Sequence, residues 1–548
     1  MQVETNTTKT AEHYSSKELN HLGLVSGMYD ELGLGEVIDQ LIPQDDEKRV
    51  LSIGQAVKAM VLNGLGFTNR ALYLTPHFFK DKPVSHLIGE GIEAEHLNDD
   101  VLGRALDAIY QFNPEKLYSH LSLVTVKHLD LLCQFGHLDS SSFHVEGQYN
   151  SQDEVEEGVI KITRGYSRDH RPDLNQVVLQ LICEQQAGIP LMMESLSGNN
   201  NDKNSFKETI NKHIEQMHND FHLEFIVADS ALYVSETLKN LNEILWISRV
   251  PGTLKLSQNV IEMVAPYLMQ NPQETSSFSL EVNYADVKQR WLVVYSPEAY
   301  HRTVKTVNKR CLKQTATEHK AFSRLCKQDF ACEADALKAL DAFEKKQKMT
   351  AVTEIEIQNL PRYKGKGRPT QNQSPDFYVY QIKGHIYSQI QNRTRLIEQK
   401  SCFILATNQL DWKSFSHQQL ISVYKNQQKV ERGFRFLKDP MFMANTLFLK
   451  SPKRIMALMM IMTLCLLIYA ALQYRIRTEL KIHNQTFPNQ TGQDISNPTA
   501  RWVFQFFSGI HVLIINQTRT IILNLNQHHL LLLKLLGNQY EQLYCGNG

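Results

Sequence analysis

Apolar residues recur with a helical period through roughly the first quarter of the chain. Two examples are Ile53–Gly66 and Asp99–Phe112, where an acid or a small polar residue precedes apolar side chains spaced three and four apart. This pattern predicts a compact α-helical domain over residues 21–130. Residues 1–20 are polar and have no such period, which predicts a flexible lead-in.

Short apolar runs of the kind found in buried strands replace the helical period after residue 130. The runs are Cys133–Gly147, Val177–Cys183, Ile189–Ser195, Phe225–Asp229 and Leu245–Val250. A turn containing Gly188 separates the second run from the third, which is typical of a hairpin. Helical segments lie between the later runs. The alternation of strands and helices predicts a mixed α/β core whose first part spans residues 131–250.

A long segment, residues 251–400, separates this core from its next strand. It contains strand-like runs such as Trp291–Pro297 and Phe377–Ile382, and one basic helix over Thr303–Lys348. The composition predicts a β-rich insertion that carries a basic helix.

The core resumes with the strand-like run Ser401–Asn408, and its second part is predicted over residues 401–478. Residues 479–548 are rich in Asn and Gln and carry apolar patches, which predicts a C-terminal helical tail.

One apolar segment, Ile455–Leu472, is long enough to raise the question of a membrane. Its 18 residues are apolar except for Thr463, and basic residues flank both ends, which meets the lower limit for a membrane span. A helix buried on all sides in a large core has the same composition. We favour the buried helix, because no second run of that length is present, and expect no membrane association.

Composition and charge describe a folded protein with no overall attraction to polyanions. The chain has 548 residues, 42% of them hydrophobic, and 58 basic residues balance 58 acidic ones. Any binding of nucleic acid must therefore depend on local clusters. The eight cysteines form no CxxC pair, which argues against a zinc finger and a disulfide framework. The N-terminus lacks the apolar core of a signal peptide, so we expect a cytoplasmic protein.

The most informative stretch is Tyr424–Lys438. On one continuous helix Glu431 lies about 20° from Tyr424 around the axis, and Lys438 about 20° further. Gln427 belongs to the same stripe. The remaining basic side chains of the stretch are Lys425, Lys429, Arg432 and Arg435. A single carboxylate among so many cations suggests a polyanion held beside a metal site, although a solvated surface helix has the same charges.

Two of the predicted core strands end in an aspartate, Asp139 and Asp229. Each alone is typical of a turn, but together with Glu431 they place three carboxylates on central elements of one α/β core. Oxygen donors of this kind suit Mg²⁺ or Mn²⁺. Two such ions about 4 Å apart can activate an attacking oxygen and stabilise a leaving one in phosphodiester displacement.

These features resemble the DDE transposases of bacterial insertion sequences, in the group with a Tyr-x2-Arg-x3-Glu-x6-Lys motif. The chain has Tyr424, Gln427, Glu431 and Lys438 at that spacing. The blocks HLDSSSFHVEG, GIPLMMESLSGNNNDK and FIVADSALYVSE are also similar to that family.

The resemblance implies a ribonuclease-H-like core in which Asp139, Asp229 and Glu431 hold two Mg²⁺ or Mn²⁺ ions and carry out catalysis. It implies an insertion between the second and third acids, and an α-helical N-terminal domain with possible DNA binding. The reaction it implies is cut-and-paste transposition: water attacks at the element ends, and the freed 3′-OH then attacks target DNA. A DNA hairpin connects these steps in related enzymes. The implied partners are double-stranded DNA, as inverted-repeat ends and target, and a second copy of the chain.

Residues of the motif and the basic residues near it are the expected DNA contacts. They are Tyr424, Gln427, Lys438, Lys425, Arg432 and Arg435, together with Arg164, Arg168 and Arg171 of the loop Arg164–Asp173. From its charge alone, that loop could equally be a solvated turn or a contact for the DNA backbone. The resemblance to the family favours the DNA contact. The run His301–Phe330 contains eight basic residues and only two acids, Glu318 and Asp329. This composition fits a DNA-facing side of the insertion and a solvated helix face equally well.

Gln427 is the departure from the family motif. An arginine there would offer a charged planar fork to a phosphate, whereas glutamine offers only a neutral amide. Lost phosphate binding would weaken activity, so the alternative is a catalytically inactive, DNA-binding remnant of a transposase. If the motif is aligned correctly, Gln427→Arg should tighten binding to element ends or raise the rate.

Overall fold

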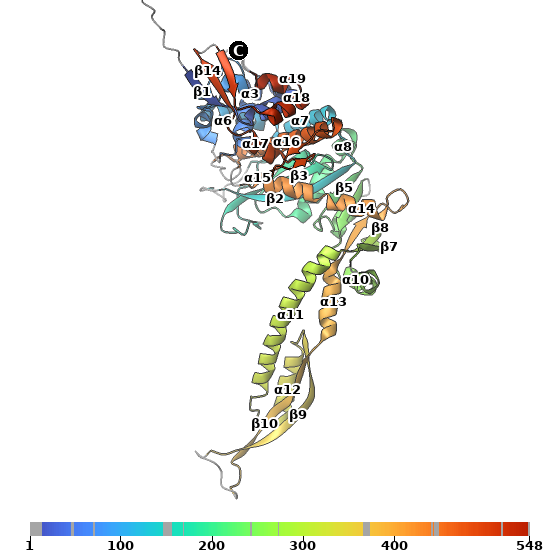
Figure 1. The fold of residues 1–548 in the computed structure, drawn as a ribbon. Helices are drawn as coiled ribbons and strands as arrows, with labels where there is room; N and C mark the ends of the chain where they lie inside the picture. Colours follow the sequence, from blue (N-terminus) through green and yellow to red (C-terminus); the bar gives the residue numbers. More distant parts are fainter. Residues whose placement is uncertain are drawn as a thin grey trace, which may run out of the picture. The chain divides into compact units, whose positions relative to one another are not determined.

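A computed structural model describes residues 14–545, apart from 45–48, 69–71, 146–148, 150–155, 168, 242–243, 272, 365–372, 440–441, 443–448 and 517–518. The chain divides into two compact units. The first unit comprises Met1–Ser248 and Gln418–Gly548, and the second comprises Arg249–His417. Each is described by itself (Figure 1).

The first unit begins with the helical domain that the apolar period predicts. Its α-helices are α1 (Leu22–Glu31), α2 (Leu34–Leu41), α3 (Ile53–Leu65), α4 (Thr75–Phe79), α5 (Val84–Leu87), α6 (Asp99–Phe112) and α7 (Pro114–His128). Two short 3₁₀ helices are η2 (Leu72–Leu74) and η3 (Ala94–Leu97). Ser52 caps α3 in a capping box with Gln55, and the Asn98 side chain caps α6. Each of these two predicted helices therefore begins after a residue whose side chain accepts a hydrogen bond from a free N–H group of the first turn.

A mixed sheet follows in the order β4-β3-β2-β5-β6. Its strands are β2 (Phe135–Val145), β3 (Asn175–Glu184), β4 (Pro190–Ser197), β5 (Phe225–Ala228) and β6 (Leu245–Arg249). The first three form an antiparallel meander, whereas β5 lies parallel to β2 and β6 parallel to β5. The helices between the strands are α8 (Asp202–Asn219) and α9 (Ser235–Asn240). This arrangement confirms the expected ribonuclease-H-like mixed α/β core.

The apolar segment forms part of α16 (Pro452–Ile482), which packs against α3, α6, α7 and β4. Among the described residues it is the one helix long and apolar enough to cross a membrane, and 94% of its most apolar window is buried inside the structure. Side chains from several elements surround it, so its apolar character is satisfied by packing. The buried-helix interpretation of this segment is confirmed.

The two ends of the chain share a small sheet, β1-β14-β15 (Figure 1). Its strands are β1 (Tyr14–Glu18), β14 (His511–Ile515) and β15 (Arg519–Leu523). The other elements after α16 are β12 (Phe487–Pro488), β13 (Asp494–Ile495), α17 (Ala500–Phe506), α18 (Gln527–Leu536) and α19 (Asn538–Leu543). The expected flexible lead-in is therefore wrong for residues 14–18, and the tail is not purely helical. The polar segment is ordered because a strand from the other end of the chain satisfies its backbone groups.

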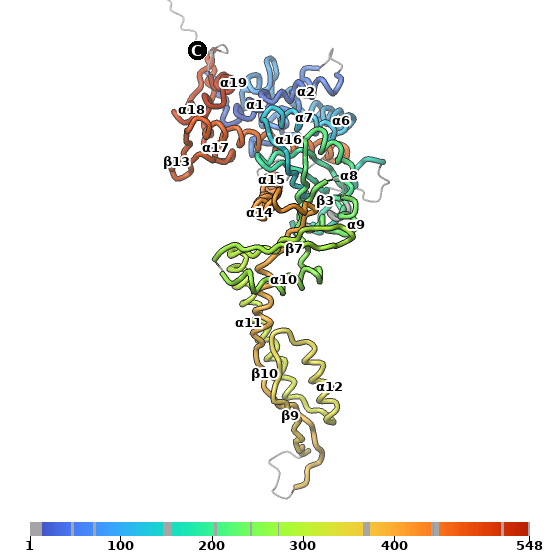
Figure 2. The backbone as a smooth tube through the Cα atoms, turned by 90° about the vertical axis from the view of Figure 1, so that its right-hand side faces the viewer, coloured from blue at the N-terminus to red at the C-terminus, as the bar shows by residue number. Residues whose placement is uncertain are grey.

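The second unit contains more helix than the β-rich insertion expected from the sequence. Its helices are α10 (Lys255–Leu268), α11 (Pro297–Leu325), α12 (Glu333–Glu344) and α13 (Ile390–Ser401). Its strands are β7 (Ser276–Tyr284), β8 (Val287–Tyr295), β9 (Thr350–Arg362), β10 (Phe377–Ser388) and β11 (Cys402–Thr407). Strands β7, β8 and β11 are antiparallel neighbours, and β9 pairs with β10 in a separate ribbon. Figure 2 shows α12 beside this ribbon, and α13 packs against α11. The basic helix predicted over Thr303–Lys348 is thus two helices.

A buried histidine in the first unit makes its stability sensitive to acid. The His21 Nε2 lies 2.8 Å from the Leu65 carbonyl oxygen, and its ring stacks on Phe504 with centroids 4.4 Å apart. Burial lowers the pKa of His21 from 6.5 to about 4. Because the folded state disfavours the proton, the stabilisation is complete above pH 6.5 and is lost as the pH falls towards 4.

We expect the His21→Gln variant to lose less stability than the wild type between pH 7 and pH 4. Glutamine keeps a donor for the Leu65 carbonyl but does not titrate. The difference should approach about 3 kcal/mol in the free energy of unfolding, measured by urea denaturation at both pH values. If the free energy of unfolding fell by the same amount between pH 7 and pH 4 in both proteins, His21 would not be buried in its neutral form.

Candidate active site

Two of the predicted catalytic acids lie on neighbouring parallel strands. Leu138 of β2 is in register with Ala228 of β5, so Asp139 and Asp229 are the next residues on adjacent strands. Parallel neighbours in a sheet run about 5 Å apart, which brings the two backbones together at this point. Asp229 follows the end of β5 as predicted. Asp139 instead lies in the middle of β2, which continues to Val145.

The third acid reaches the sheet from a helix. Glu431 is exposed in the first turn of α15 (Gln428–Leu437). An open pocket of about 760 Å³ brings it together with Asp139. The residues lining this pocket are Asp139, Ser140, Ser141, Glu431, Phe434, Arg435, Lys438 and Asp439. Acids that are distant in the sequence therefore share one cavity, whereas Asp229 lies outside its lining.

The three acids do not form a tight cluster. Their carboxylate oxygens do not all lie within 4.8 Å of one another. Asp139 Oδ1 accepts a hydrogen bond from the Ser140 amide, and Asp229 Oδ1 accepts one from the Ala231 amide, each at 2.8 Å. The backbone carbonyl of Asp229 accepts a hydrogen bond from the Ser248 hydroxyl, so β6 supports this position.

The helix that carries Glu431 is interrupted. The first piece, α14 (His417–Lys425), ends before a turn at Asn426 and Gln427, and α15 begins after the turn. The continuous stripe predicted from Tyr424 to Lys438 is therefore wrong. Gln427 is only 7% exposed, whereas Glu431 is exposed on the next turn. Gln427 in the turn and Glu431 on α15 thus face different surroundings.

Gln427 joins the start of α15 to β2. Its Nε2 donates a hydrogen bond to the Leu138 carbonyl at 2.9 Å, and its Oε1 accepts one from His137 Nδ1 at 3.0 Å. Burial lowers the pKa of His137 to about 4, so the ring is neutral at neutral pH. Both partners directly precede Asp139. The expected DNA contact by Gln427 is therefore corrected: its buried amide positions the helix of Glu431 against the strand of Asp139.

Lys429 provides a second connection between α15 and the sheet. Its Nζ donates hydrogen bonds to the carbonyls of Gln185 and Gln186 in the β3–β4 turn. Burial lowers the pKa of the Lys429 ammonium, and the nearby Glu184 opposes that shift. The Glu184 carboxylate accepts backbone hydrogen bonds within the same turn. In the sequence Lys429 is one of several similar cations, and nothing in the local pattern distinguishes it.

Close packing positions the back of α15. Val430, Phe434 and Leu437 are buried on one side of the helix, and Gly433 lies between them. A Cβ atom at Gly433 would come within 3.0 Å of the Leu466 side chain on α16. The glycine therefore allows α15 to approach the buried central helix closely, which leaves Glu431 on the accessible side.

The basic residues predicted to contact DNA have varied surroundings. Lys438 Nζ forms an ion pair with Asp169 at 2.8 Å and lies 5.5 Å from the centroid of the Phe143 ring. Arg171 forms an ion pair with Asp173. Arg168 lies outside the described residues. Four of the predicted cations are exposed and form no ion pair with a described residue: Arg164, Lys425, Arg432 and Arg435. Tyr424 is half-buried. Lys438 thus connects the end of α15 to the basic loop.

A separate acidic group lies between α7, β4 and α8. Donor atoms of Glu115, Glu194 and His213 lie within 4.8 Å of one another, the one such group found among the described residues. Lys212 forms ion pairs with both glutamates, at 2.7 and 3.0 Å. Its ammonium therefore compensates part of the negative charge of the two carboxylates. The three residues are far apart in the sequence, and no local motif points to this group.

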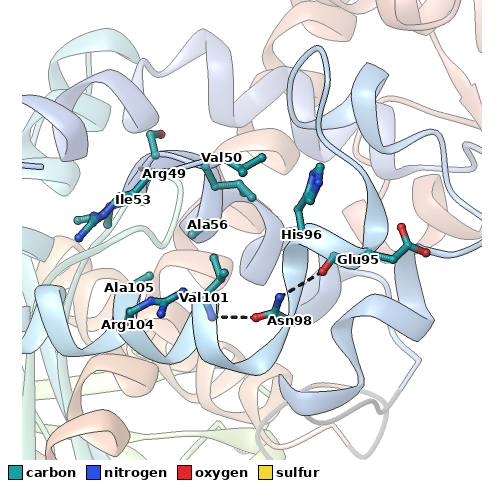
Figure 3. Close-up of a pocket in the computed structure, with 12 residues that line it drawn as sticks. Arg49, Val50, Ile53, Ala56, Glu95, His96, Asn98, Val101, Arg104 and Ala105 are labelled. Atoms are coloured by element: carbon teal, nitrogen blue, oxygen red, sulfur yellow. Dashed lines mark hydrogen bonds between the residues drawn. The ribbon is translucent and has the colours of Figure 1, made fainter. Parts of the chain in front are cut away.

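Figure 3 shows a further pocket, in the helical domain, with a volume of about 420 Å³. Arg49, His96 and Arg104 line it beside the first turns of α3 and α6. The Asn98 side chain already accepts the Val101 amide hydrogen at the start of α6. The helix starts thus leave few free backbone donors for a ligand in this pocket.

Comparison with known proteins identifies the family of this chain. Residues 134–468, more than half of the chain, match the family described as Transposase DDE domain. The chain belongs to that family. Residues 14–123 of this transposase match a second family, described as a domain of unknown function, DUF4277. No curated protein matches the sequence.

Among solved structures, the transposase is similar to one titled "Cryo-EM structure of piggyBac transposase synaptic complex with hairpin DNA (SNHP)". The sequence identity is 8%, with a TM-score of 0.34, and the match covers 90% of this chain and 82% of that chain.

Proposed function

We propose that this transposase cuts DNA at the ends of an insertion sequence and joins the cut ends to target DNA, with Asp139, Asp229 and Glu431 as its catalytic acids. The observation that carries the proposal is the shared pocket of Asp139 and Glu431, with Asp229 on the adjacent strand. The Tyr424, Gln427, Glu431 and Lys438 spacing supports membership of the group with the Tyr-Arg-Glu-Lys motif.

The donor chemistry of the three acids fits Mg²⁺ or Mn²⁺. All three offer carboxylate oxygens, which these ions prefer. Acids spread over more than 4.8 Å suit a pair of ions better than a single ion, because two ions need ligands on both sides. Two bound ions would supply Lewis-acid activation of the attacking oxygen and stabilisation of the leaving oxygen.

The chain's own residues bind and orient the DNA in this proposal. Arg435 lines the pocket beside Glu431 and is exposed, so its guanidinium is available to a phosphate next to the cut bond. Lys438 lies in the same lining, and a phosphate that replaces Asp169 as its partner would keep its charge neutralised. We place Tyr424, Lys425, Arg432, Arg164, Arg168 and Arg171 along the DNA backbone on either side.

Two chemical steps follow from the class of reaction. In the first, the oxygen of water attacks a phosphodiester at the element end, and the 3′-oxygen leaves and is protonated. In the second, that 3′-OH attacks a phosphodiester of target DNA, so that one P–O bond forms as another breaks. A dimer that holds both ends together, a DNA hairpin between the steps and a cytoplasmic location complete the proposal.

The alternative is a remnant that binds DNA but no longer cuts it. It rested on Gln427, whose neutral amide replaces a phosphate-binding arginine in the motif. The buried hydrogen bonds of Gln427 favour the active enzyme, because a residue that positions Glu431 from the interior need not carry charge. For the same reason, tighter DNA binding by Gln427→Arg is no longer expected.

Strand cleavage on DNA from the coding region's flanks separates the two functions. The substrate is a duplex that carries the matching inverted repeats, and the reactions contain Mg²⁺ or EDTA. We expect nicking at the repeat end only with Mg²⁺. Binding of these ends in Mg²⁺ without any nicking would support the remnant.

A further inference from the structure

Helix α11 in the second unit carries a row of positive charges along one face, here named the α11 stripe. It consists of Arg302, Lys305, Lys309, Lys313, Lys320 and Arg324. At about 100° per residue, all six lie within a sector about 100° wide around the helix axis. The residues are exposed along the whole length of this face.

The opposite face of α11 packs against the rest of the second unit. Its buried residues are Thr303, Val307, Cys311, Glu318 and Phe322. They occupy a sector centred about 160° from the middle of the stripe. Three of them belong to the apolar clusters that α11 forms with its neighbours. Val307 and Cys311 pack with Ile397 in one cluster, and Phe322 packs with Ile382 in the other. The helix is thus fixed with its charged face outwards.

No described carboxylate forms an ion pair with the stripe, although Glu298 lies one turn before Arg302 on the same face. Arg302 Nε donates to the Glu298 backbone carbonyl. Glu318 is buried on the other face, where its carboxylate accepts hydrogen bonds from the Lys348 amide and the Thr350 hydroxyl. Asp329, the other acid of this run, pairs with Arg362.

Repulsion between the like charges of the stripe lowers the stability of the helix, a cost that a solvated face of mixed charges would avoid. Lys305, Lys309 and Lys313 are spaced four apart, as are Lys320 and Arg324. Like charges at that spacing repel by about 0.2–0.5 kcal/mol per pair, and solvated helices usually alternate the two signs instead. A polyanion on this face would remove the repulsion.

We propose that the α11 stripe binds the phosphate backbone of duplex DNA. From Arg302 to Arg324 the helix rises about 33 Å, which is close to one turn of B-form DNA. Lysine and arginine side chains along a regular helix can make charge-assisted contacts with phosphates, and such contacts do not depend on the base sequence. The choice of DNA over other polyanions rests on the proposed function. The stripe provides a DNA-binding surface additional to the catalytic pocket.

Binding to a plain duplex without element ends tests this surface. The variant Lys305→Gln/Lys309→Gln/Lys313→Gln removes three adjacent charges of the stripe. The matched control, Lys338→Gln/Lys345→Gln/Lys346→Gln, removes three exposed lysines in and just after α12. The affinity of the full chain for a 40-base-pair duplex is measured by fluorescence anisotropy at several salt concentrations.

We expect the stripe variant to bind about 10- to 100-fold more weakly than the wild type at 0.1 M salt. The slope of log affinity against log salt should become shallower by about 2–3, since each phosphate contact contributes about 0.9. The control should differ little from the wild type in both measures. Equal affinities and slopes for the stripe variant and the control would overturn the proposal.

The two proposals fail separately. If the wild type nicks element ends while the stripe variant binds the plain duplex as the control does, the stripe proposal is wrong and the transposase function stands. If the stripe variant loses duplex binding but the wild type never nicks, the stripe stands and the catalytic function does not. Circular dichroism spectra of both triple variants report whether α11 stays folded.

Discussion

Glu431→Gln is expected to abolish strand cleavage while leaving DNA binding intact. The amide keeps the shape of the carboxylate but loses its negative charge, which divalent ions require of a ligand. Loss of several kcal/mol of transition-state stabilisation corresponds to a rate decrease of about 1,000-fold or more. The measurement is the rate of nicking at element ends in Mg²⁺, with the affinity for the same ends determined in parallel.

Asp439→Asn is the matched control for this change. Asp439 lines the same pocket, but its carboxylate pairs with Arg501. We expect cleavage by this variant within a few fold of the wild type. Comparable losses in both variants would indicate that the pocket responds to any lost charge, and undiminished cleavage by Glu431→Gln would exclude Glu431 from catalysis.

Gln427→Leu is expected to destabilise the first unit by about 2–4 kcal/mol and to slow cleavage. The substitution leaves the Leu138 carbonyl and the His137 Nδ1 hydrogen buried without partners, and each such group costs about 1–3 kcal/mol. The start of α15 would also lose its connection to β2. Urea denaturation measures the first effect, and nicking rates at a temperature where the variant is folded measure the second.

The neighbouring glutamine provides the control for this variant. Gln428 is exposed and lies one residue further along, so Gln428→Leu should change the free energy of unfolding by less than about 0.5 kcal/mol. If Gln427→Leu were as stable as Gln428→Leu, the buried hydrogen bonds of Gln427 would not be formed.

Local patterns predicted the elements whose signals are short-range. The capped helices α3 and α6 and the apolar strands of the core are readable because a period or a capping residue lies within a few positions. Strand β1 was missed for the opposite reason. Its partner β14 is almost at the other end of the chain, and neither segment alone shows why it should be ordered.

The candidate site also combines features with a local signal in the sequence and features that depend on distant contacts. The types of Asp139, Asp229 and Glu431, and their expected positions on core elements, select them from the sequence as candidate catalytic acids. The role of Gln427 was not accessible, because the helical wheel assumed a continuous helix and so placed it beside Glu431. Whether a polar side chain faces solvent or two buried partners depends on contacts with β2, far away in the sequence.

The most direct test of the account is the location of bound metal. Crystals of the wild-type transposase grown with Mn²⁺ would be measured by anomalous X-ray scattering. The account predicts two peaks, about 4 Å apart, in contact with the carboxylates of Asp139, Asp229 and Glu431. Peaks confined to other sites, such as the Glu115–Glu194–His213 group, at a Mn²⁺ concentration that supports cleavage would contradict it.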